Sequence, residues 1–519
     1  MILSMPHGIF QMLNYESFKY LSGAESIIQN GTYRHYGGKP TYVTPPGTSL
    51  LYAGFAALTS KPPESMILPL NILCYLVTAV SLYLLLRQII SNGTLRSLIL
   101  ICVLLNPPFL ALHNRMLSEA PCMAFFMLSN VFFVKVLTNE KRQAMHGVMA
   151  LFFLGWAAFI RHAVIALVPL FLGALYLALE KKTKRGRIWT ASLLAATLPS
   201  AILWHMLKVP RPNLLFQALP RSEGGKWHPP SIEGVLTLGP WANKMVGGVL
   251  DHRAAIIFLS ILFILIPFAA LGLTCQKPGA ERERRVLLFF ALGPVFYVLF
   301  LFFIHALGPP TFVESNLARY LSLMFPYSAI AAILACQIFY KIARQGSTIL
   351  WQRAGKLCLV FTLAGLGVIA LHNVHSVSGV ILKAKPAVDS PQTGRKTCVG
   401  ADSIVNALRK YAADHPDFLK GDRIFMSNYP GLAWYALRRE MILLEPRGFR
   451  RAKPATGGTS PPLTILYLHK DEVCPNASCW SVTRELVPYP RIADAENSEV
   501  LLRQSGLSIL ELSDPTRFP

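Results

Sequence analysis

Long apolar runs recur through most of the chain and restrict it to one broad structural class. A helix of about 20 residues crosses a hydrocarbon core of roughly 30 Å. Hydrophobic residues make up 53% of the 519 residues and charged residues only 15%, which excludes a wholly water-soluble protein. We therefore predict an all-α polytopic membrane domain of about ten spans. The runs occupy residues 66–86, 96–111, 118–137, 144–160, 163–179, 188–207, 254–273, 286–306, 318–340 and 351–372.

Lysine and arginine indicate which side of the membrane each short loop faces. The formal net charge is +23, but the bases are not gathered on one soluble domain, so we predict no nucleic acid partner. The strongest cluster is KKTKRGR at 181–187, and every second short connection around it is also basic. Short basic loops stay in the cytoplasm, so the connections near Arg115, Arg161 and Arg319 are predicted to face the other side. Ten spans place both termini on that side too.

The segment that precedes the first run, residues 1–65, is polar, aromatic and rich in turns. We interpret it as a first outer loop. Its apolar stretch at 46–58 follows a Pro-Pro-Gly turn and is too short to span, so we predict a helix that lies on the membrane surface or re-enters it. The N-terminus shows no basic export signal. We therefore predict a further span upstream, eleven in the full protein; a short signal anchor in the first residues is the alternative.

The composition changes after residue 375, where charges, proline and glycine increase. Residues 403–415 have helical spacing, whereas RIFMSN, MILLE, LTILYLH and LSILELS read as strands. We predict a membrane domain at 1–375 and a separate extracytoplasmic α/β domain at 376–519. Cys474 and Cys479 bracket a turn on the predicted oxidising side, where a disulfide is plausible.

Ionisable residues gather at the predicted outer ends of the spans. A charged side chain at membrane depth costs about 2.5 to 3.5 kcal/mol on insertion scales, so such residues usually have a function. Carboxylates and guanidiniums in one layer suit a phosphate-bearing ligand and a proton-transfer step. The residues are Glu16, Arg115, Glu119, Arg161, His162, Arg319 and Tyr320.

Simpler explanations exist for each member of this layer. Arginines at span ends often reach lipid head groups. Glu119 could pair with Arg115, or stabilise a helix start that Ser118 caps. Glu16 could be a solvated loop carboxylate.

Several short motifs occur in a fixed order on the predicted outer side. In the opening loop, an acidic residue is followed by a Tyr, an Ala, an NG-x-Y turn and the sequence PPG. Further along the chain, the sequence LSE begins a predicted span, and an arginine begins an apolar stretch that ends in proline. The sequence RYL begins one of the last predicted spans. They are Glu16, Tyr20, Ala24, residues 30–33 and 45–47, Leu117 to Glu119, Arg161 to Pro169, and Arg319 to Pro326.

This order is similar to that of the GT-C glycosyltransferases, especially bacterial relatives of protein O-mannosyltransferases and of the lipid A aminoarabinose transferase. The resemblance extends through about 370 residues and fades in the tail. The family's acidic residue is usually Asp, whereas Glu16 is longer by one methylene. The family also has a transmembrane helix directly before this loop.

The resemblance implies transfer of a sugar from a polyprenyl-phosphate donor to an unidentified acceptor. In that reaction Glu16 would be the base, and Glu119 would orient the acceptor or a divalent ion. Arg161 and Arg319, with Arg115 as a further candidate, would hold the phosphate. The remaining predicted substrate-binding residues are Tyr20, His162 and Tyr320.

The resemblance also implies a location and a set of partners. We predict a bacterial inner membrane protein, surrounded by membrane lipid, whose active site and C-terminus face the periplasm. No cofactor is firmly predicted, because relatives differ in their use of a divalent metal.

Two other functions are compatible with some of the same sequence features. A transporter or lipid flippase would also have a polar outer layer, but the sequence has no inverted repeat and no matching pair of broken helices. A catalytically inactive relative that assists polysaccharide assembly is the third possibility.

Overall fold

The chain divides into two compact units in the computed structural model. The first contains residues 1–5, 68–206 and 211–386, and the second contains 6–67, 207–210 and 387–519. The residues described are 15–36, 45–90, 92–113, 116–138, 142–179, 239–246, 248, 250–275, 281–307, 317–345, 349–383, 401–420, 423–427, 430–439, 441–443, 463–468, 498–504 and 507–512.

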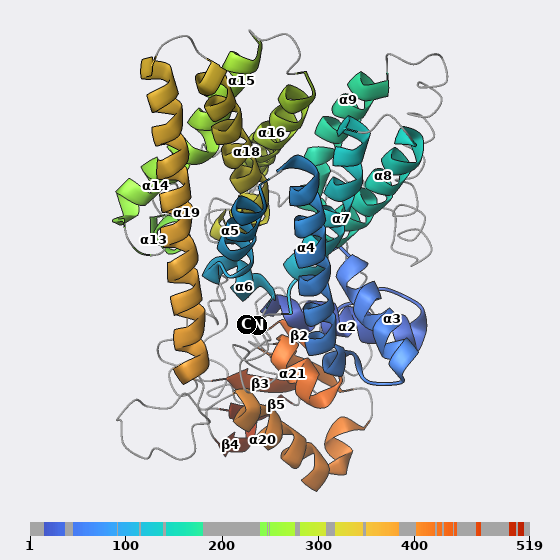
Figure 1. Cartoon of the computed structure of the whole chain (residues 1–519). Coiled ribbons are helices and arrows are strands. Elements are labelled where there is room, and N and C mark those ends of the chain that lie inside the picture. Colours follow the sequence, from blue (N-terminus) through green and yellow to red (C-terminus); the bar gives the residue numbers. More distant parts are fainter. Residues whose placement is uncertain are drawn as a thin grey trace. The chain divides into compact units, whose positions relative to one another are not determined.

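The first unit consists of apolar helices that run alongside one another (Figure 1). Most of the predicted runs lie on these helices, and only 188–207 is outside the described residues. The helices are α4 (Ile67–Ile89), α5 (Gly93–Leu104), α6 (Pro107–His113), α7 (Glu119–Thr138), α8 (Gln143–Ile160), η3 (His162–Leu167), α9 (Val168–Leu179), α13 (Gly239–Met245), α14 (His252–Ser260), η5 (Ile261–Leu265), α15 (Ile266–Cys275), α16 (Glu281–Leu307), α18 (Leu317–Gln345) and α19 (Ile349–Lys383).

Several of these helices are long enough and apolar enough to cross a membrane, as expected for a multi-pass membrane protein. Five of the described helices meet this test, or six if α5 and α6 together form one span that bends by 61°. The bend coincides with Pro107 and Pro108, because proline cannot continue a helix through its own position but fits the first turn of the next. The count of ten spans remains a prediction.

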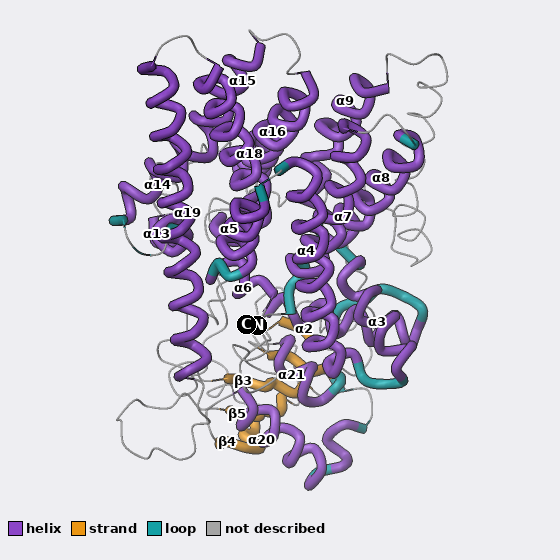
Figure 2. The backbone as a smooth tube through the Cα atoms, in the orientation of Figure 1, coloured by secondary structure: helices purple, strands orange, loops and turns teal. Residues whose placement is uncertain are grey.

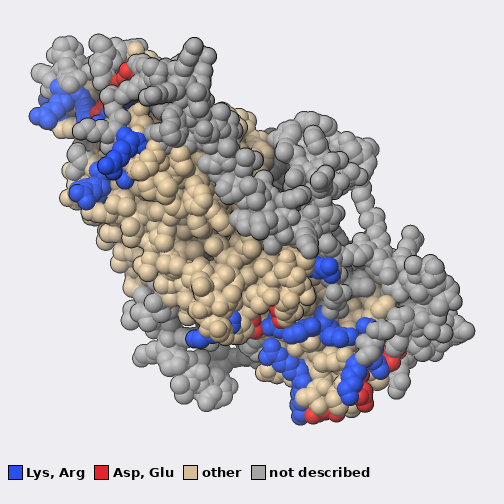
Figure 3. Space-filling model, turned by 90° about the vertical axis from the view of Figure 1, so that its right-hand side faces the viewer, with Lys and Arg blue, Asp and Glu red and all other residues tan. Residues whose placement is uncertain are grey.

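The surface of the molecule agrees with a membrane environment. On the face shown in Figure 3, uncharged side chains cover a broad band of the described surface. Contact with hydrocarbon favours uncharged side chains, because a charged group at membrane depth is costly.

Helices α16 and α18 approach each other closely at Gly293. Tyr327 of α18 is fully buried beside it, and its hydroxyl donates to Asn130 Oδ1 of α7. A Cβ at position 293 would lie 2.4 Å from Tyr327 Cδ1, well inside van der Waals contact. A glycine is therefore required here for the buried Tyr327 ring to pack against α16, and small residues are common at such membrane helix interfaces.

We expect Gly293→Ala to destabilise the helical unit by about 1 to 3 kcal/mol, because a well-packed interface must move to admit the methyl group. Thermal unfolding in detergent measures the effect. The matched control is Gly272→Ala in α15, where an added Cβ meets no atom within 4 Å. That change should be neutral or slightly stabilising, since alanine favours helices by up to about 1 kcal/mol over glycine. Equal midpoints for the two variants would contradict this packing.

The second unit combines the opening segment with the tail. Its strands form a five-stranded sheet in the order β2-β1-β3-β5-β4, with α20 and α21 in the same part of the chain (Figure 2). Strand β1 is parallel to β2 and β3, whereas β5 is antiparallel to β3 and β4. The elements are α2 (Tyr15–Asn30), α3 (Gly47–Thr59), η2 (Pro63–Met66), α20 (Ala401–Asp414), η6 (Pro416–Leu419), β1 (Ile424–Ser427), α21 (Pro430–Leu437), β2 (Met441–Leu443), β3 (Leu463–Leu468), β4 (Ser498–Gln504) and β5 (Leu507–Leu512).

The helix predicted at 403–415 and the four predicted strands are all present. Helix α21 and strand β4 were not predicted. The division of the chain at residue 375 stays a prediction, and the two segments that it separates, 6–67 and 387–519, pack within one unit.

The opening segment is more regular than its turn-rich composition predicts, since 15–30 form helix α2 rather than a loop. The buried residues Phe18, Leu21 and Ala24 are three residues apart, a spacing that places them along one side of a helix. The helix predicted at 46–58 is α3, at Gly47–Thr59; its placement at the membrane surface stays a prediction.

Candidate functional site

The first candidate residues lie where α7 begins. Residues 116–118 form a bend, and Glu119 is the first residue of the helix. A carboxylate in the first turn interacts favourably with the helix dipole. The side chain of Glu119 is nevertheless fully buried, and a buried carboxylate requires a charged or hydrogen-bonding partner.

Arg161 supplies that partner from the break between α8 and η3. Its backbone is extended, with φ −147° and ψ 110°, which ends α8 at Ile160. Arg161 Nη1 donates to Glu119 Oε1 at 2.7 Å and to Ser118 Oγ at 3.0 Å. Only 9% of the arginine side chain is exposed. The pair is therefore a charge-assisted contact largely removed from water, and both partners depend on it.

The sequence predicts Glu119 and Arg161 in one layer but leaves their contact open. Pairing with Arg115 was the alternative, and Arg115 is outside the described residues. Glu119 also lies at the start of a helix, as in the simpler explanation of this residue, in which its carboxylate stabilises the first turn. Its contact with Ser118, in which Oγ donates to Glu119 Oε2 at 3.5 Å, is long.

His113 is a further polar residue of this region that the sequence analysis missed. It ends α6 and is fully buried. Its Nδ1 lies 3.0 Å from the carbonyl oxygen of Phe109, and its Nε2 has no hydrogen-bond partner among the described residues. His113 is near enough to interact electrostatically with Glu119. The only feature of the sequence that could have indicated a role for His113 is its position two residues before Arg115, a predicted site residue.

Glu16 and Tyr20 lie in the other unit, on α2. Glu16 is half-buried in the first turn, and Tyr20 is buried. The carbonyl oxygen of Tyr20 accepts a hydrogen bond from Ser49 Oγ of α3 at 2.9 Å. A shared cavity for Glu16 and the Glu119–Arg161 pair stays a prediction, because the two belong to different units.

The other predicted site residues lie where two further helices begin. Arg319 and Tyr320 lie in the first turn of α18, and their side chains are outside the described part. His162 begins η3 and is partly exposed. Their roles remain predictions. Cys474 and Cys479 also lie outside the described residues, so the predicted disulfide is untested.

The described residues contain no group of three or more His, Cys, Asp or Glu side chains that could hold a metal ion. A divalent metal at Glu119 therefore has too few described ligands, since its buried carboxylate is already paired with Arg161.

Comparison of the backbone with solved structures gives a long match. The chain aligns with ArnT from Cupriavidus metallidurans bound to undecaprenyl phosphate at a TM-score of 0.56 and 12% identity, over 97% of this chain and 95% of that one. For the apo state of the same protein, the TM-score is 0.57 and the identity 12%, over 95% and 93%. The chain has an ArnT-like fold. This is the fold that the resemblance stated from the sequence motifs implies, so the resemblance is confirmed.

Further comparisons give a match to a protein family and a match to a second solved structure. Residues 43–205 match the family described as dolichyl-phosphate-mannose-protein mannosyltransferase. The archaeal oligosaccharyltransferase AglB from Archaeoglobus fulgidus aligns at a TM-score of 0.47 and 11% identity, over 89% of this chain and 66% of that one. The search among curated proteins found no match.

The family match and the site geometry concern the same part of the chain. Residues 43–205 include Ser118, Glu119 and Arg161. They also include the Pro-Pro-Gly sequence at 45–47, where α3 begins. Glu16 and Arg319 lie beyond the matched range on either side.

Proposed function

We propose that this protein transfers a sugar from a polyprenyl-phosphate donor to an acceptor at the outer face of the membrane. The observation that carries the proposal is the buried Glu119–Arg161 contact within an ArnT-like fold. It lies in the segment that matches the mannosyltransferase family. A buried arginine held by a carboxylate is a rigid cationic group, as binding of a lipid phosphate requires.

The matched structures support the choice of donor. One of them is ArnT bound to undecaprenyl phosphate. We propose a donor of the same chemistry, a sugar joined to a polyprenyl phosphate. The sugar and the acceptor are not specified by any residue of the described site.

The reaction breaks one bond and forms another at the anomeric carbon of the sugar. A base removes the proton of the acceptor group, whose freed electron pair attacks the anomeric carbon. The bond from that carbon to the phosphate oxygen breaks, and the polyprenyl phosphate leaves with the electron pair. Such a step needs a positioned base and positive charge where the leaving group develops its own charge.

We assign these two roles to separate groups. Glu16 is the proposed base, because it is a half-buried carboxylate on a defined helix. Arg161 is the proposed phosphate ligand, with Arg319 and Arg115 as further members. Glu119 then has a supporting role: its contact with Nη1 fixes the guanidinium plane, which reduces the entropy lost when phosphate binds.

The proposal includes an orientation in the membrane. Basic short loops favour a cytoplasmic side opposite to Arg115, Arg161 and Arg319. The active site and the tail would then face the periplasm of a bacterial inner membrane. The tail would shield the site or help to select the acceptor.

Reconstituted proteoliposomes separate this proposal from a lipid flippase. Wild-type protein is supplied with a polyprenyl-phosphate sugar labelled in the sugar, together with an envelope extract as the source of acceptor. A transferase releases polyprenyl phosphate and moves the label to another molecule. A flippase moves the intact donor to the opposite leaflet, and that result alone would refute the proposal.

A further inference from the structure

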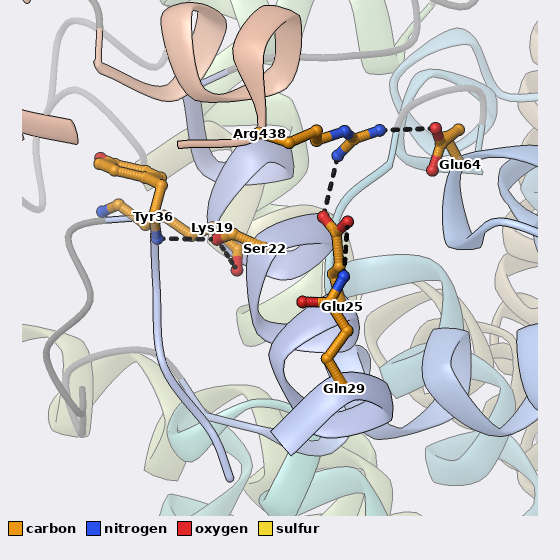
Figure 4. A network of polar contacts seen from close by, with 7 residues as sticks. All are labelled: Lys19, Ser22, Glu25, Gln29, Tyr36, Glu64 and Arg438. Atoms are coloured by element: carbon orange, nitrogen blue, oxygen red, sulfur yellow. Dashed lines mark hydrogen bonds and ion pairs between the residues drawn. The ribbon is translucent and has the colours of Figure 1, made fainter. Parts of the chain in front are cut away.

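Arg438 lies in the second unit where the tail contacts the opening segment (Figure 4). It directly follows helix α21, and its φ of 54° is in the left-handed region. Glycine or asparagine is usual at such a position, because a Cβ is strained there. The backbone conformation at this position therefore does not favour arginine. The contacts of the arginine side chain explain its presence better.

The guanidinium of Arg438 joins two elements of the opening segment. Its Nη1 donates to Glu25 Oε2 of α2 at 3.1 Å, and its Nη2 donates to Glu64 Oε1 of η2 at 2.6 Å. It also lies 4.7 Å from the ring centroid of Trp434 and 4.8 Å from that of Tyr435. A planar fork that stacks on rings while binding two carboxylates is available to arginine and not to lysine.

The contact between Arg438 and Glu25 belongs to a group of three charges, because Glu64 lies close to both residues. Burial raises the pKa of Glu25, the nearby Glu64 raises it further, and Arg438 opposes both effects. Without the arginine, two partly buried carboxylates would face each other. Exposed pairs usually contribute little, but here one cation neutralises two anions from separate elements.

The contacts with the tail follow one side of α2. Phe18, Ser22 and Glu25 are spaced four and three residues apart, so they share a helix face. The ring of Phe18 packs against Tyr435 at 5.9 Å between centroids. The Tyr36 amide donates to Ser22 Oγ at 3.1 Å, and the amide of Met441 donates to the carbonyl oxygen of Tyr36 at 2.7 Å.

Glu16 lies on the opposite side of the same helix. It shares the helical spacing of Tyr20 and Gly23, which face α3 and the loop after α2: a Cβ at Gly23 would lie 2.7 Å from Ser49 Oγ and 2.4 Å from Tyr33 Cε2. Glu25 and Glu16 are separated by about 14 Å along the helix axis, at 1.5 Å per residue. Any effect of Arg438 on Glu16 must therefore pass through the position of the helix.

We propose that Arg438 is a positioning residue that holds α2 against the tail and thereby fixes the location of Glu16. This inference rests on the proposed function, in which Glu16 is the base. The tail would then contribute to the chemical step through α2 without supplying a reacting group.

The test compares Arg438→Gly with Arg423→Ala in the full-length protein in nanodiscs. Glycine relieves the strained backbone while it removes the side chain. The control removes an arginine of the same unit whose contact, to Glu511 Oε2 at 2.8 Å, stays within the tail. Amide hydrogen exchange of α2 and the kcat and KM for a labelled polyprenyl-phosphate sugar are measured for each variant.

We expect the α2 amides to exchange at least tenfold faster in Arg438→Gly than in wild type. In the variant, α2 can open locally without first breaking its contact with the tail. Its kcat should fall tenfold or more, since small displacements of a base are costly, while the KM for the donor changes less than about threefold. Arg438→Lys should fall between the glycine variant and wild type, and Arg423→Ala should match wild type in both measurements.

Unchanged α2 exchange in Arg438→Gly would overturn the anchoring of α2. Faster exchange with a normal kcat would overturn the link to Glu16. A wild-type protein that transfers no sugar would contradict the proposed function instead, and the exchange measurement alone would then still decide whether Arg438 anchors α2.

Discussion

Replacement of Glu119 by alanine should be among the most destabilising single changes in the helical unit. The substitution leaves the guanidinium of Arg161 buried without the carboxylate that it contacts at 2.7 Å. Removal of one partner from a buried pair typically costs about 3 to 5 kcal/mol. We expect the apparent unfolding midpoint in detergent to fall by several degrees, and sugar transfer to fall at least a hundredfold because Arg161 loses its fixed orientation.

A double-mutant cycle distinguishes this loss from general damage to the core. Glu119→Gln, Arg161→Met and the combined variant are compared with wild type in the same unfolding measurement. The combined variant should be more stable than the sum of the single losses predicts, since neither charge is then left alone. Additive losses would show that the two side chains are not coupled, contrary to the observed contact.

Glu16→Gln should abolish sugar transfer while the donor still binds. The amide has almost the same shape as the carboxylate but cannot accept a proton, so the loss falls on the chemical step and should reach a hundredfold or more in kcat. Affinity for the polyprenyl-phosphate sugar, measured by titration in nanodiscs, should change by less than about threefold. Arg161→Ala should differ, because both affinity and rate depend on a phosphate contact.

Two companion variants make the Glu16 result specific. Glu16→Asp introduces the acid that is usual among the glycosyltransferases whose motifs this chain resembles, and it should keep or increase activity. Asp417→Asn neutralises an exposed carboxylate of the same unit, paired with Lys420, and should leave transfer unchanged. Normal turnover by Glu16→Gln would exclude Glu16 as the base and make Glu119 the next carboxylate to test.

The elements that the sequence predicted best are those with a strong periodic pattern. Helix α20 has apolar residues at helical spacing, and β3 is a short, mostly apolar run of a kind typical of buried strands. Strand β4 was missed because it has only three apolar residues, at 500–502, between the charged Glu499 and Arg503. Helix α2 was missed because serine, lysine and a glycine give it the composition of a loop.

The candidate site could be predicted only as a set of residues on one side of the membrane. Arg161 lies 42 residues after Glu119, and only the packing of α7 against α8 decides that these two meet. Likewise, no sequence pattern links Glu25 to Arg438, which are 413 residues apart. Motif order predicts which residues share a layer, whereas tertiary packing decides which of them touch.

The most direct test of the proposed transfer is the mass of the products formed from a polyprenyl-phosphate sugar labelled with a heavy isotope. Purified wild-type protein and Glu16→Gln are incubated with the donor and an envelope extract. The account predicts that wild type releases free polyprenyl phosphate and forms a product heavier by one labelled sugar, and that the variant forms neither above background. An intact donor after incubation with wild type, or equal product from both proteins, would contradict it.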